Sequence, residues 1–128
     1  MLPLMWVAAI LAATVHVLIF CMESLWWDSP GIRKRFRQTD AQAEASRLFA
    51  FNQGFYNLFL AFGIAAGLVL AAHGHPGVGF VLVGWNCLSM VGAAVVLVVS
   101  APRMRVAALI QGGAPLVFLV AAAVGGLS

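Results

Sequence analysis

The sequence contains very few charged residues: only 9% of its 128 residues are Asp, Glu, Lys or Arg, and only four are acidic. Because 63% of the residues are hydrophobic and the mean hydropathy is +1.02, the chain has too little polar surface to coat a water-soluble globule of this size. Soluble enzymes and soluble binding domains are therefore excluded. The net charge of +3 comes from the loops, so it indicates membrane orientation and contact with anionic headgroups rather than nucleic-acid binding.

Several chemical signatures are also missing. The sequence has no nucleotide-binding glycine loop, no nucleophile-elbow serine, no zinc-binding helix motif and no haem attachment sequence, so we expect no cofactor. Cys21 and Cys87 fall in different apolar runs at different estimated depths, which argues against a structural disulfide. His73 and His75 have a spacing that metals use, but without a third ligand they predict no metal site.

What the sequence does contain is four apolar runs of membrane-spanning length, separated by two short basic stretches. A helix needs roughly 20 residues to cross the hydrocarbon core. The predicted spans are residues 3–27, 48–72, 77–100 and 106–126. The sequence thus predicts an all-α polytopic membrane protein, with residues 1–128 forming a single domain, an antiparallel bundle of four transmembrane helices.

The positions of the basic residues predict the orientation of this bundle. All seven lie between spans 1 and 2 or between spans 3 and 4: Arg33, Lys34, Arg35, Arg37, Arg47, Arg103 and Arg105. The positive-inside rule places both stretches in the cytoplasm, so both termini are expected outside, in an N-out/C-out topology. The first run lacks a basic segment before it and a small-residue cleavage site after it, so we expect a retained helix rather than a signal peptide. The predicted location is a bacterial inner (plasma) membrane, with both termini periplasmic.

Local patterns predict where the helices begin and bend. Thr39 and Gln42 have capping-box spacing, so the second long helix is expected to begin near residue 40 and to project two turns beyond the lipid. Residues 32–38 form either a solvated charged loop or one or two turns of interfacial helix. The third long helix is expected from about Val78, and Pro115 predicts a kink in the fourth.

Polar residues inside a span are costly and require an explanation. In the first span, His16 and Glu23 are seven residues apart and lie within about 20° of each other on one helix face. The second span carries four polar residues within six positions: Asn52, Gln53, Tyr56 and Asn57. With a rise of 1.5 Å per residue, these side chains lie about 6 to 16 Å from the cytoplasmic boundary. The pattern predicts a pocket that is open toward the cytoplasm or the inner leaflet and closed on the outside.

The helix faces refine this prediction. Asn52 and Tyr56 share a face with Gly63 and Gly67, whose spacing permits close helix approach in the outer half, or equally a dimer seam. The other two amides of the second span point roughly 100° away, toward a different neighbour. The competing interpretation is that intramembrane polar residues are interhelical hydrogen-bond glue. That interpretation suits best the isolated polar residues of the last two spans, Asn86, Ser89 and Gln111.

One stretch of the second span resembles a known family. The run Asn52-Gln53-Gly54-Phe55-Tyr56-Asn57 with the following Phe59-Leu60-Ala61, after a first helix bearing His16, Glu23 and Trp26, resembles a bacterial and fungal family of small four-helix membrane proteins. That family carries only a domain-of-unknown-function label. The resemblance covers nearly the whole chain and implies a compact four-helix fold in the plasma membrane, but no reaction or substrate. It implies the same site positions, namely His16, Glu23, Asn52, Gln53, Tyr56 and Asn57.

Two functional interpretations follow. In the first, these six residues bind a small, largely apolar or lipid-like molecule in a cytoplasm-facing intramembrane pocket. Four helices offer little material for alternating access, so transport of that molecule would need a homodimer. In the second, the protein is an intramembrane enzyme that moves a proton along a lipid-like substrate, as an isomerase does, with His16 and Glu23 as catalytic candidates. A third interpretation, a structural accessory subunit, explains the intramembrane polarity poorly.

Overall fold

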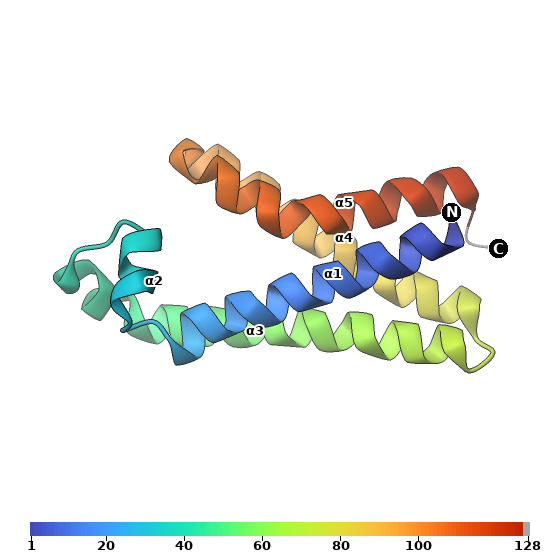
Figure 1. Ribbon diagram of the computed structural model, residues 1–128, viewed down its shortest axis with the longest axis horizontal. Helices are drawn as coiled ribbons and strands as arrows, with labels where there is room; N and C mark the ends of the chain where they lie inside the picture. The colour runs from blue at the N-terminus through green and yellow to red at the C-terminus, as the bar shows by residue number, and fades with distance from the viewer. Residues whose placement is uncertain (127–128) are drawn as a thin grey trace.

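The computed structural model describes residues 1–126, and these residues form helices joined by short turns, with no strand among them (Figure 1). The four long helices are α1 (Leu2–Phe20), α3 (Asp40–Ala72), α4 (Pro76–Ser100) and α5 (Arg105–Gly125). A π-helical turn, Cys21–Leu25, extends α1, a short helix α2 (Pro30–Arg35) follows it, and a 3-10 turn, Pro102–Met104, precedes α5. All four long segments are long and apolar enough to span a membrane, which confirms the predicted all-α bundle.

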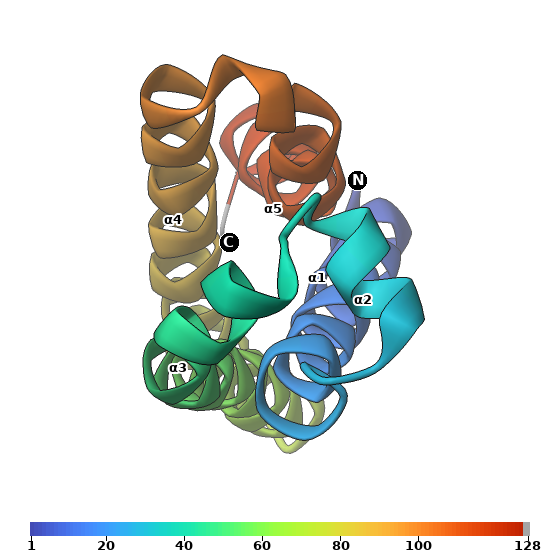
Figure 2. The same cartoon turned by 90° about the vertical axis from the view of Figure 1, so that its left-hand side faces the viewer.

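The long helices form a ring in which each one is antiparallel to its two neighbours. α1 packs against α3 and α5, α4 packs against α3 and α5, and α1 barely touches α4. The start of α1, the end of α5 and the turn between α3 and α4 lie at one end of the bundle, which we call the termini end (Figure 1). α2 and the 3-10 turn lie at the other, which we call the basic end. Seen from the basic end, α2 and the segment leading into α3 lie in front of the bundle (Figure 2).

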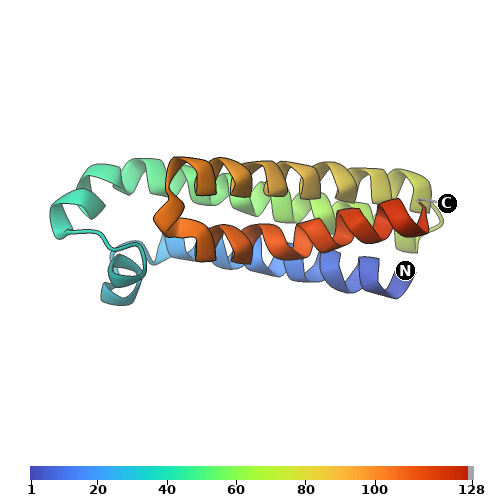
Figure 3. The same cartoon turned by 90° about the horizontal axis from the view of Figure 1, so that it is seen from above.

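The helix ends follow the sequence signals closely. The Thr39 hydroxyl accepts a hydrogen bond from Gln42 N at 3.1 Å, and the Gln42 side chain accepts one from Thr39 N at 2.9 Å, so the predicted capping box is confirmed. α3 then extends past the connection between α4 and α5 (Figure 3). α4 begins at Pro76, two residues before the predicted start, because proline is well suited to the first turn of a helix. Of the two interpretations of residues 32–38, the helix is correct as far as Arg35.

The main hydrophobic core cluster occupies the half of the bundle at the termini end. Its buried residues are Met5, Ala8, Ala9 and Ala12 of α1, Ile64 of α3, Phe80, Val83, Cys87 and Met90 of α4, and Phe118, Ala121 and Ala122 of α5. Glycines bring α3 and α4 together here. A Cβ atom on Gly67 would lie 2.6 Å from Gly79 O, and one on Gly63 would lie 2.5 Å from the Asn86 amide. The Gly63-x-x-x-Gly67 pattern therefore forms a seam within the chain.

Toward the basic end, α4 and α5 diverge as a pair from α1 and α3 (Figure 1). Side chains on the interior face of α3 become more exposed in the same direction. Ile64 is fully buried, whereas Gln53, eleven residues earlier and about 20° away on the same face, is exposed. Tyr56 is 61% exposed although it lies seven residues before Gly63, on the face that meets α4.

Packing within each of these helix pairs continues to the basic end. In the α4–α5 pair, a Cβ atom on Gly112 would lie 2.7 Å from the Ala94 Cβ. In the α1–α3 pair, the π-turn touches Gly54. The two closely packed helix pairs thus diverge toward the basic end, and we call the region between them, from His16 to the basic end, the open half.

Candidate functional site

Glu23 lies in the π-helical turn that ends the first membrane-spanning segment. Trp26 N donates to Cys21 O at 2.8 Å, the five-residue hydrogen bond that characterises such a turn. π-helical turns are rare and are found frequently at functional sites. The sequence has no recognised signature for a π-turn, so sequence reasoning placed Glu23 correctly in the first span but missed its local geometry.

The Glu23 carboxylate is bound from the neighbouring helix α3. Asn57 Nδ2 donates to Glu23 Oε1 at 3.0 Å and also to the backbone carbonyl of Gln53 at 3.0 Å. Both Glu23 and Asn57 are half-buried. The two amide hydrogens of Asn57 are thus used, one to hold the carboxylate and one to hold the amide itself in place.

The next residue, Ser24, fixes the π-turn against α3. Its hydroxyl donates to Phe51 O at 2.7 Å. A Cβ atom on the buried Gly54 would overlap the Ser24 hydroxyl and would lie 3.1 Å from Phe20 O. Ser24 was missed at the sequence level, although Gly54, three residues before Asn57, was a signal for a close approach on this face.

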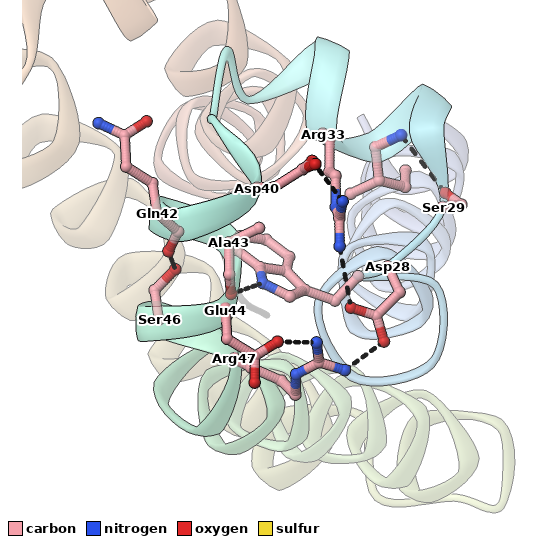
Figure 4. Close-up of polar contacts among 11 residues, drawn as sticks. Asp28, Ser29, Arg33, Asp40, Gln42, Ala43, Glu44, Ser46 and Arg47 are labelled. Carbon is pink, nitrogen blue, oxygen red and sulfur yellow. Dashed lines mark hydrogen bonds and ion pairs between the residues drawn. The ribbon is translucent and has the colours of Figure 1, made fainter.

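A polar clamp joins the segment after the π-turn to the start of α3 (Figure 4). Arg47 pairs with both Asp28 and Glu44, and Arg33 pairs with Asp40 at 2.5 Å and with Asp28 at 3.6 Å. These pairs are largely exposed, so each contributes little stability.

Trp27 is the stronger anchor of this segment. Its side chain is 8% exposed, and its Nε1 donates to Ala43 O at 2.9 Å. An indole that buries its ring while satisfying its N–H contributes both apolar contact and a hydrogen bond. This anchor, rather than the exposed ion pairs of the clamp, is what holds the segment after the π-turn against α3.

His16 lies at the floor of the open half, one turn beyond Ala12, the last core residue of α1. Its side chain is 2% exposed, and Nδ1 is 2.9 Å from Ala12 O. In a neutral ring the nitrogen that faces a carbonyl carries the hydrogen, so Nε2 keeps its lone pair and is an acceptor. Within residues 1–126, no hydrogen bond joins His16 to Glu23. A proton relay between them would therefore need a bridging substrate or water.

The remaining predicted site residues are exposed and lie on two faces of α3. Gln53 follows the interior face, in line with Ile64, whereas Asn52 and Tyr56 follow the face that Gly63 turns toward α4. Their side chains make no hydrogen bond within the described part of the chain. The structure therefore brings Glu23 and Asn57 together and leaves Asn52, Gln53 and Tyr56 exposed.

In the part of the chain that the structure describes, Asn86 and Ser89 do not form the interhelical hydrogen bonds that were predicted for them. Asn86 donates to Leu82 O at 2.9 Å and Ser89 donates to Trp85 O at 3.0 Å, in both cases within α4. The interpretation of these two side chains as interhelical hydrogen-bond glue is therefore wrong, because the nearest carbonyl of their own helix satisfies them. Gln111 is half-buried and lies on the same face of α5 as Phe118, toward the interior of the open half.

Two cavities lie away from these residues. One, of about 290 Å³, opens at the termini end and is lined by Met5, Trp6 and Phe80 among others. The other, of about 420 Å³, is an apolar groove between α4 and α5. Neither is lined by any of the six predicted site residues, and the described residues contain no cluster of three side chains suited to a metal ion.

Comparison with known proteins identifies the family but no activity. No curated protein and no solved structure matches the chain. One family model, described as "Protein of unknown function (DUF1304)", matches residues 10–123. The match includes part or all of each long helix and every predicted site residue from His16 to Asn57. The chain therefore belongs to the DUF1304 family of proteins of unknown function.

Proposed function

We propose that this membrane protein binds a small, largely apolar molecule in the open half of the bundle, with a polar group of that molecule at Glu23. The observation that carries the proposal is the Glu23–Asn57 contact, at 3.0 Å, in a region outside the main hydrophobic core cluster. A carboxylate within a span is expensive, and such residues usually face a cavity or a partner and serve a function. Here one oxygen is held by Asn57, and the other is left for a ligand.

The face of α3 that lines the open half supports the same conclusion. Gln53 is exposed on the interior face, and Tyr56 is exposed on the α4-facing side. In a bundle that simply filled its interior, these positions would carry apolar side chains packed against α4 and α5. Polar and amphipathic side chains there suit a site that holds a molecule with one polar group and a hydrocarbon body.

The orientation proposed for this site is cytoplasmic. Five basic residues at the basic end have no ion-pair partner in the described residues, namely Lys34, Arg35, Arg37, Arg103 and Arg105. Uncompensated cations next to membrane spans favour the cytoplasmic side, which would place both termini in the periplasm of a bacterial inner membrane. The open half would then face the cytoplasm and the inner leaflet.

Photolabelling with 3-trifluoromethyl-3-phenyldiazirine, a small apolar carbene precursor, tests the proposal. Purified protein in lipid nanodiscs is labelled with and without an excess of the unreactive parent compound, and the labelled residues are mapped by mass spectrometry. We expect labelling that saturates at residues of the open half, such as His16 and Gln53.

Two tryptophan variants provide the matched comparison. Gln53→Trp fills the interior face and should remove the saturable labelling, whereas Phe62→Trp, at a position 58% exposed on the opposite face of α3, should not. Labelling that never saturates, or that is equal in the two variants, contradicts a binding site in the open half.

A further inference from the structure

Glu23 is the only acidic side chain that has no cationic partner in residues 1–126. The other three, Asp28, Asp40 and Glu44, each pair with Arg33 or Arg47 at the basic end. Glu23 instead receives one neutral hydrogen bond from Asn57. A half-buried carboxylate in an apolar span, held by an amide alone, has its hydrogen-bonding partly satisfied but its charge uncompensated.

The surrounding protein does not supply the missing charge. The clamp next to the π-turn contains three carboxylates and two guanidinium groups, which leaves it one net negative charge. The basic residues outside the clamp are on α2, after it, in the 3-10 turn or at the start of α5, at the basic end. In water such charges are screened beyond a Debye length of about 8 Å. Among the described residues none of them forms an ion pair with Glu23.

The hydrogen-bonding groups of the open half also favour a positively charged ligand. Both hydrogens of the Asn57 amide are already donated, to Glu23 and to Gln53 O. His16 presents an acceptor, because its Nδ1 faces Ala12 O. An anionic group would meet acceptors and a carboxylate, whereas a cation would meet complementary groups. The Gln53 and Gln111 amides both donate and accept, so they do not discriminate between the two.

From these observations we propose that the ligand class is lipophilic cations: an ammonium or other onium group on an apolar body, with the charge at the Glu23 carboxylate and the body between the two helix pairs. This inference rests on the proposed function, because it needs the open half to be a binding site. It adds the sign of the ligand's charge and names the residue that selects it.

Binding of radiolabelled tetraphenylphosphonium to the purified full-length protein tests the inference. Tetraphenylborate has nearly the same shape and the opposite charge, and benzyltrimethylammonium is a smaller cation; both are used as competitors. We expect saturable tetraphenylphosphonium binding that benzyltrimethylammonium displaces and tetraphenylborate does not. Glu23→Gln should weaken binding of the cation about tenfold or more, as expected when a desolvated charge loses its partner.

The control variants separate charge from folding. The amide introduced by Glu23→Gln still carries a carbonyl oxygen for Asn57, so the melting temperature should change little, and Glu23→Asp should retain part of the cation binding. Glu44→Gln removes an acid from the clamp rather than from the open half and should leave binding unchanged. Equal binding of the cation and the borate, or full binding by Glu23→Gln, overturns the inference.

The diazirine experiment distinguishes the two proposals from each other. Saturable diazirine labelling together with no binding of either cation would leave the open half as a binding site and overturn its selectivity for cations. Absence of both signals would overturn both proposals.

Discussion

The hydroxyl of Ser24 occupies the position that a Cβ atom on Gly54 would take, and from there it donates to Phe51 O at 2.7 Å. This contact brings the backbone of the π-turn against the backbone of α3. Because Glu23 precedes Ser24 and Asn57 follows Gly54 by one turn, the same contact sets the distance between carboxylate and amide. Glycine is normally unfavourable in the middle of a helix, but the missing side chain of Gly54 leaves the room that the Ser24 hydroxyl needs.

Replacing Gly54 by alanine should destabilise the protein by about 1–3 kcal/mol, the usual cost of forcing an extra methyl group into a packed contact. The change should lower the melting temperature in detergent and abolish the saturable labelling. Gly92→Ala is the matched control, since a Cβ atom at Gly92 of α4 would meet nothing within 4 Å. Equal effects of the two substitutions would show that the Ser24 contact does not restrict Gly54.

The two glycines of the α3–α4 seam should differ in their tolerance of alanine. A Cβ atom on Gly67 would lie 2.6 Å from the backbone carbonyl of Gly79, whereas one on Gly63 would meet the side-chain amide of Asn86. A side chain can rotate away but a packed backbone cannot, so Gly67→Ala should lower the melting temperature more than Gly63→Ala. The reverse order would mean that Asn86 cannot move.

Asn57 and Gln53 are both amides of α3 and should respond differently to leucine. Asn57→Leu leaves Glu23 without its donor, which should cost about 1–3 kcal/mol, the penalty for an unsatisfied buried polar group. Gln53→Leu removes a side chain that has no hydrogen-bond partner among the described residues, so stability should change by less than about 0.5 kcal/mol. Thermal-shift measurements in detergent compare the two, and a larger loss for Gln53→Leu would contradict the assigned contact.

The proposed orientation predicts the accessibility of single cysteines. In a background with Cys21 and Cys87 replaced by alanine, a cysteine at Gly74 should react with a membrane-impermeant maleimide in intact cells. A cysteine at Arg37 should react only after the membrane is permeabilised. The opposite pattern would invert the topology and place the open half on the outer side.

The sequence was sufficient to predict the elements of this fold that depend on composition and local chemistry. Four apolar runs predicted the four long helices, and the Thr39–Gln42 capping box predicted the start of α3 to the residue. Helical periodicity also placed Asn52 and Tyr56 on a different face of α3 from Gln53 and Asn57. It did not establish which of these faces meets α1, because that depends on how the helices pack around the ring.

Other features had no local signal. The π-turn at Cys21–Leu25 and the ion pairs of Arg33 and Arg47 depend on contacts between segments far apart in the sequence. The sequence instead suggested that the arginines orient the chain and contact anionic headgroups. Polarity near the basic end predicted a pocket there, whereas the divergence of the two helix pairs depends on how the helices pack and had no signal in the sequence.

The main core cluster joins the α1–α3 pair to the α4–α5 pair near the termini end. Toward the basic end the two pairs diverge, so a rotation of one pair relative to the other would move its far end most. α4 has 25 residues and is therefore about 37 Å long. A rotation of the α4–α5 pair by about 10° around the packed half would displace its far end by about 3.5 Å over a free arm of roughly 20 Å. Small adjustments among alanines and glycines of the packed half would thus be amplified near Glu23, toward the opposite end of the bundle.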